Sequence, residues 1–153
     1  MQRRHLLHIL VCSFVFFLML PCLSYGFNPS TASLEEQLVF LNTETVPSTI
    51  DQAKVNRFRF LLDALEKKHT EDRKAIANIT SKTQGILRGD GISESLLDIM
   101  ESMHNIKLDS RLGKTSYLEL NVMYTMLRAD GMSRPEAVNG LMGLLNGIAQ
   151  TKK

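Results

Sequence analysis

Cysteine is scarce in this chain, and tryptophan is absent altogether. The two cysteines, Cys12 and Cys22, both lie within the first 26 residues, so the rest of the chain has no internal disulfide and no thiolate. A disulfide-stapled fold and cysteine-based catalysis are therefore excluded for that remainder. It is still long enough to bury a hydrophobic core without such crosslinks.

The chain also lacks a strong excess of charge of either sign. It contains 18 Lys and Arg against 16 Asp and Glu, and two of the basic residues, Arg3 and Arg4, lie among the first 26 residues. The rest of the chain is therefore neutral, with no electrostatic reason to bind DNA, RNA or anionic lipid. The sequence accordingly predicts no nucleic-acid partner.

Long hydrophobic runs are missing except over residues 6–20, a run that follows the two arginines. Pro21 ends this run, and small residues lead to Gly26, which is the order of a secretory signal peptide. The run is shorter than the ~20 residues of a spanning helix, so we expect cleavage before Phe27. An uncleaved anchor and a lipidated Cys22 are the alternative interpretations.

The sequence therefore predicts a signal peptide over 1–26, a flexible leader over 27–32, a helical domain over 33–150 and a basic tail over 151–153. A cysteine-free exported domain suits a bacterial periplasm, or secretion from the cell. No stable membrane span is expected once the signal peptide has been removed.

Apolar residues recur at helical spacing, and strand-like alternation is nearly absent. We therefore expect an all-α single domain, a small bundle of five or six helices arranged in antiparallel hairpins. The segment 50–88 fits one long helix or two helices broken near Thr70, and its charged middle, 66–74, is expected to be solvated. The helix over 117–128 is apolar on most faces and is expected to be the central, buried element.

Helix boundaries are marked by capping residues. Two heptapeptides, 87–93 and 127–133, share the pattern Leu-Arg-x-Asp-Gly-x-Ser, which predicts a glycine-ended helix and then a new helix capped by serine. Convergence on the same turn chemistry explains this match better than an internal duplication, because the flanking helices barely resemble each other. The predicted caps are Ser33, Ser93, Ser116, Ser133, Gly91 and Gly131.

Two Glu-x-x-His patterns are the only candidates for a metal centre. Glu66 with His69, and Glu101 with His104, would each share one helix face, as in the di-iron helical bundles. A histidine near a helix end or in a charged stretch has simpler explanations, so no metal or other cofactor is favoured. The sequence shows no phosphate-binding glycine loop and no nucleophile elbow, and an enzyme is the less favoured class.

The last expected helix has an unusual face. Three glycines and several amides lie opposite its apolar arc, and this face carries no charge. Each helical glycine costs up to ~1 kcal/mol relative to alanine, so their presence favours close approach of another helix or chain. The residues of this candidate contact face are Asn139, Gly140, Gly143, Asn146 and Gly147.

The sequence therefore predicts an exported, non-enzymatic helical protein that acts through helix-mediated contacts, as an adaptor, a chaperone-like binder or an accessory subunit of an envelope complex. A protein partner or self-association is expected. The alternative is a bundle that binds a small ligand or a metal through the Glu-x-x-His patterns.

Overall fold

The computed structural model describes residues 31–43 and 50–151. The predicted signal peptide, residues 27–30 of the predicted leader and residues 152–153 of the predicted basic tail lie outside this part of the chain. The described residues form one 3-10 helix (Ser110–Leu112) and six α-helices: α2 (Leu34–Asn42), α3 (Gln52–Lys68), α4 (Arg73–Gly89), α5 (Leu96–Asn105), α6 (Tyr117–Ala129) and α7 (Arg134–Thr151). The predicted all-α bundle is confirmed.

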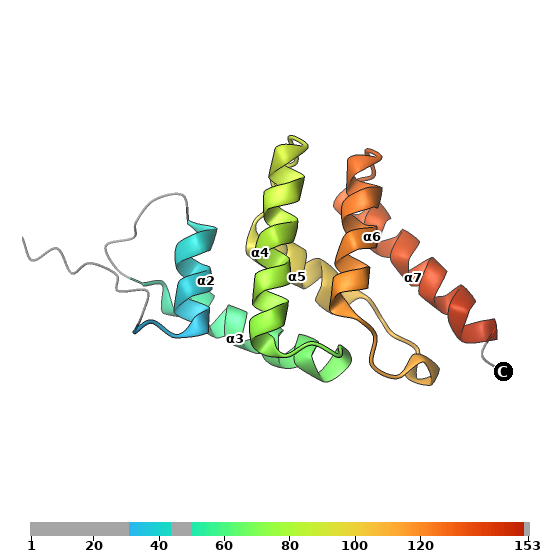
Figure 1. Ribbon diagram of the computed structural model, residues 1–153, viewed down its shortest axis with the longest axis horizontal. Helices are drawn as coiled ribbons and strands as arrows, with labels where there is room; N and C mark the ends of the chain where they lie inside the picture. The colour runs from blue at the N-terminus through green and yellow to red at the C-terminus, as the bar shows by residue number, and fades with distance from the viewer. Residues whose placement is uncertain (1–30, 44–49, 152–153) are drawn as a thin grey trace, which may run out of the picture.

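The helices form two layers, which are visible in Figure 1. Helices α2, α4 and α6 stand side by side in one layer, and α3, α5 and α7 cross behind them. Helix α4 packs against both α3 and α5, and α5 also contacts α3 and α7. The pairs α2–α3, α4–α5 and α6–α7 each pack together, and each pair contacts the pair before it.

A break separates α3 from α4. The backbone is extended at His69, directly after the end of α3, and the Asp72 carboxylate then caps α4 by accepting from the Ala75 N–H at 2.8 Å. The segment therefore contains two helices and not one. The expectation of a solvated middle is wrong at His69, which is only 1% exposed because it packs against the loop before α6.

The two shared heptapeptides form two Schellman turns. The Ile92 N–H donates to the Leu87 carbonyl at 2.8 Å, and the Met132 N–H donates to the Leu127 carbonyl at 3.2 Å. Gly91 has φ 77° and Gly131 has φ 89°, in the left-handed region that such turns require. The same local chemistry thus joins α4 to α5 and α6 to α7.

Serine caps begin the helices after these turns, but not both at the expected position. Helix α5 is capped by Ser95 and not by Ser93, because Ser95 and Asp98 complete a reciprocal capping box two residues further along. Helix α7 starts directly after Ser133, whose N–H and hydroxyl both donate to Glu136. Ser33 and Ser116 cap α2 and α6.

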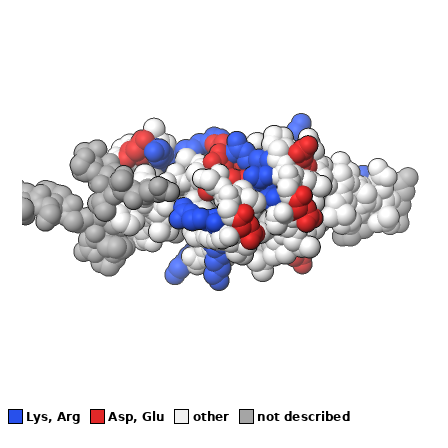
Figure 2. All heavy atoms as spheres, turned by 90° about the horizontal axis from the view of Figure 1, so that it is seen from above, with Lys and Arg blue, Asp and Glu red and all other residues white. Residues whose placement is uncertain are grey.

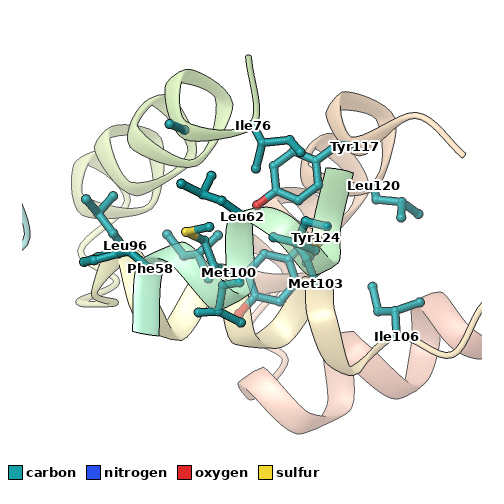
Figure 3. Close-up of a cluster of buried hydrophobic side chains, with 14 of the residues drawn as sticks. Phe58, Leu62, Ile76, Leu96, Met100, Met103, Ile106, Tyr117, Leu120 and Tyr124 are labelled. Atoms are coloured by element: carbon teal, nitrogen blue, oxygen red, sulfur yellow. The ribbon is translucent and has the colours of Figure 1, made fainter. Parts of the chain in front are cut away.

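One hydrophobic core runs through the bundle. Figure 3 shows its centre, where side chains of α3, α4, α5 and α6 converge. Helix α6 is not buried on several sides, and the expectation that it would be is wrong. Tyr117, Leu120 and Tyr124 face the core, whereas Leu118, Val122 and Met126 are each more than half exposed. Over the described residues, no helix has the length and hydropathy of a membrane span.

Candidate functional site

The first Glu-x-x-His pattern lies at the end of α3. The His69 ring is buried, its Nδ1 is 3.1 Å from the Thr115 hydroxyl, and its edge meets the Tyr117 ring at 5.2 Å. Burial lowers the pKa of His69, and its buried Nε2 has no hydrogen-bond partner among the described residues. This histidine connects α3 to the segment that enters α6.

The second pattern is on α5, and its two members have separate contacts. Glu101 forms an ion pair with Arg57 of α3 at 2.8 Å, while the His104 ring packs edge-on against Phe60 at 5.5 Å. Burial, together with the nearby Lys68 and Arg57, lowers the pKa of His104. Within residues 31–43 and 50–151, no group of three or more His, Cys, Asp or Glu side chains is placed to hold a metal ion.

A groove lies between α5 and the first half of α7, with a volume of about 390 Å³. At its rim, Arg134 forms an ion pair with Asp98, a residue that also belongs to the Ser95 capping box. Both charged groups are therefore already paired, so the groove does not present a free cation or anion to a ligand. Its lining residues are Glu101, Ser102, Asn105, Arg134, Pro135, Val138, Asn139 and Met142.

A buried polar cluster links α6 to the loop before α5. Glu94 forms an ion pair with Arg128 at 2.6 Å and accepts a hydrogen bond from the Tyr124 hydroxyl at 2.7 Å. The Glu94 side chain is only 6% exposed and that of Arg128 15%. Burial raises the pKa of Tyr124, and the hydrogen bond to Glu94 raises it further. This cluster holds α6 to the loop before α5, and its three polar side chains are all paired with one another.

The sequence-predicted contact face lies on the exposed side of α7. A Cβ added at Gly140 would be 3.5 Å from the Leu127 side chain, which is an ordinary van der Waals distance. A Cβ added at Gly143 or Gly147 would meet no atom within 4 Å in the described structure. Packing among the described residues therefore does not require these two glycines. Asn139 and Asn146 are exposed on the same helix.

Two large apolar side chains accompany these glycines. Leu144 is 49% exposed and Ile148 is 42% exposed. The second half of α7 projects beyond the other helices (Figure 1). Figure 2 shows almost no charged side chains on this end of the molecule. We call residues 143–151 the α7 tail. It is an uncharged surface that combines large exposed apolar side chains with glycines that have open space beside them.

A second apolar surface lies on α6, and sequence reasoning missed it. Leu118, Val122 and Met126, which we call the α6 stripe, are 52%, 51% and 63% exposed. Their spacing of four residues places them on one face of the helix. That spacing was a signal, but an apolar helix whose neighbours are unknown does not reveal which of its faces is buried.

Comparison with known proteins places most of this chain in one family. The model of the MoxZ family matches residues 38–145. No curated protein and no solved structure matches the chain. The matched region runs from α2 into α7, so it contains both Schellman turns, the groove and the α6 stripe.

Proposed function

This chain belongs to the MoxZ family, and from that premise we propose that it is an exported, non-enzymatic protein that acts through helix-mediated protein contacts. The α7 tail is the proposed contact surface. The observation that carries the proposal is the exposure of Leu144 and Ile148 beside two glycines, Gly143 and Gly147, at which an added Cβ would meet no atom of the described residues within 4 Å. Large apolar side chains next to open glycines offer both burial and close approach to a second chain.

The charge of α7 supports the same proposal. From Ala137 to Thr151 the helix carries no ionisable side chain, although much of its surface faces solvent. Protein interfaces are depleted in charged residues at their centre, because burying an unpaired charge is costly. Asn146 and Gln150 supply amides that both donate and accept hydrogen bonds. An accessory or adaptor role in the bacterial envelope fits a surface of this kind.

Site-specific photocrosslinking in the native host tests this proposal. A photoreactive residue at Asn146, in the α7 tail, is expected to yield a discrete protein adduct. The same residue at Arg59, which is exposed on α3, serves as the matched control and is expected to yield none. Gly143→Leu in the Asn146 crosslinking background is expected to remove the adduct while helix content, measured by circular dichroism, stays unchanged.

Either of two results would contradict this proposal. If Asn146 gives no adduct above the Arg59 background, or if Gly143→Leu leaves the adduct unchanged, the α7 tail is not a contact surface. Export is tested separately, by cell fractionation and by sequencing the N-terminus of the mature protein. A mature N-terminus at Phe27 is the expected result.

A further inference from the structure

The outer face of the α4–α6 layer carries two parallel stripes of exposed residues. The α6 stripe is apolar throughout. The corresponding residues of α4, which we call the α4 stripe, also recur every fourth position and are all exposed: Lys74, Asn78, Lys82 and Ile86. In both helices these stripes lie opposite the buried side chains.

Two hydrogen bonds fix how the stripes lie relative to each other. The Thr80 hydroxyl is 2.8 Å from the Tyr117 hydroxyl, and the Thr83 hydroxyl donates to the Asn121 side-chain carbonyl at 3.2 Å. Both pairs join α4 to α6 in a parallel register, with sequence offsets that differ by a single residue. Figure 1 shows α4 and α6 side by side, and the two hydrogen bonds put Ile86 at about the level of the second half of α6.

Charge distinguishes the two stripes. Lys74 and Lys82 form no ion pair with any described residue, so the α4 side presents free positive charge. Glu119 is the one acidic residue of α6, and it lies outside the α6 stripe. Gly85, exposed on α4, leaves open space where a side chain would otherwise project. The surface is therefore apolar along α6 and basic along α4.

We propose that this face binds an amphipathic helix of a partner protein, which presents apolar residues to the α6 stripe and acidic residues to Lys74 and Lys82. An amphipathic helix that lies along this face would bury the α6 stripe against its own apolar side. A second copy of this chain is a poorer occupant, because its own apolar stripe is flanked by lysine and not by acid. This surface is separate from the α7 tail, and its test is independent.

Two synthetic peptides provide the probe. Each has about 18 residues, enough for a stable helix when bound, and carries the same leucine stripe. One peptide has glutamates along one flank and the other has lysines. With the purified full chain, fluorescence anisotropy is expected to show the glutamate peptide binding at least about tenfold more tightly than the lysine peptide.

Substitutions on the two stripes complete the test. Val122→Glu is expected to weaken binding of the glutamate peptide about tenfold or more, because it places a charge in the apolar contact. Lys82→Glu is expected to reverse the preference in favour of the lysine peptide. Lys67→Glu, at an exposed position of α3, is the matched control and leaves both affinities unchanged. Circular dichroism checks that each variant is folded.

Several results would overturn the proposal. These are equal affinity for both peptides, no binding of either, or an unchanged preference in Lys82→Glu. Binding to vesicles of anionic phosphatidylglycerol, lost in Val122→Glu, would show instead that the face is a lipid-binding surface. Self-association that Val122→Glu abolishes in sedimentation would identify a second copy as the occupant.

Discussion

Glu71, in the loop between α3 and α4, caps the N-terminus of α6 by accepting a hydrogen bond from the Tyr117 N–H at 2.8 Å. The Leu118 N–H and the Ser116 hydroxyl donate to the same carboxylate at 3.1 and 2.9 Å. A helix N-terminus has unsatisfied N–H groups and a positive end of the helix dipole, so a carboxylate there is stabilising. One side chain, distant in sequence, therefore reinforces the Ser116 cap at the start of α6.

Replacing Glu71 is expected to weaken the fold. Glu71→Ala removes three hydrogen bonds at the start of α6 and should lower the free energy of unfolding by about 1–2 kcal/mol. Urea denaturation followed by circular dichroism measures this loss. Glu66→Ala on α3, whose side chain has no such role at a helix end, is the control and should have a smaller effect. Equal losses in the two variants would contradict the capping role.

Acid should also weaken this cap. Burial alone would raise the pKa of Glu71, but the hydrogen bonds from Tyr117, Leu118, Ser116 and Thr70 outweigh it and lower that pKa to about 2. Its contribution to stability is therefore present above pH 4.5, the ordinary value, and is lost as the pH falls towards 2. Denaturation midpoints across this range should fall less steeply in Glu71→Ala than in the unaltered chain.

His69 makes stability depend on pH in a different window. Burial lowers the pKa of His69 below its ordinary value of 6.5, against opposing contributions from the Thr115 hydrogen bond and Glu71 and with added lowering from Lys68 and Lys114. The unfolded chain then binds a proton more readily than the folded chain, so stability falls as the pH drops through 6.5. Urea titrations at pH 7.5 and 5.5 are expected to show this loss, and a smaller one in His69→Phe. The His104→Phe variant separates the contribution of the second histidine, whose pKa is also lowered by burial.

Alanine substitutions at Gly143 and Gly147 of α7 should change stability in the opposite direction from a substitution at the turn glycine Gly131. Gly143→Ala and Gly147→Ala should each stabilise the isolated chain by up to ~1 kcal/mol, because the added Cβ meets no atom and helix propensity improves. Gly131→Ala should destabilise it by about 1 kcal/mol, because φ at that position is in the left-handed region. Thermal melts of the three variants measure both effects. If alanine at 143 or 147 destabilises the free chain, a contact within the chain requires those glycines.

The Glu94–Arg128 pair should contribute more than the exposed pair between Asp109 and Arg111. Glu94→Gln leaves a largely buried guanidinium without its counter-charge, and should cost about 3 kcal/mol. Asp109→Asn breaks a pair at the surface, and the unfolding midpoint should not change measurably. Chemical denaturation of both variants gives the comparison. Equal effects would show that the Glu94 cluster is not held in a low-dielectric environment.

Local chemistry in the sequence determined much of this fold. The helix periods, the serine caps at Ser33 and Ser116, and the Schellman turns at Gly91 and Gly131 all depend on residues within a few positions of one another, so they can be read along the chain. The shift of the α5 cap from Ser93 to Ser95 is the same kind of chemistry. Ser93 and Ser95 are both possible caps, and Ser95 caps the helix because Asp98, three residues later, completes the capping box.

The tertiary structure decided what each face of those helices meets. Periodicity marks an apolar face, but α6 is apolar on several faces, and only packing against α4 and α7 leaves the α6 stripe outside. The sequence places His69 in a charged segment that is expected to be solvated, but in the structure the loop before α6 covers its side chain. Glu71 gains its role from Tyr117, a residue far along the chain. The sequence determined the helices and their ends through short-range hydrogen bonds, whereas burial and exposed contact surfaces depended on long-range packing.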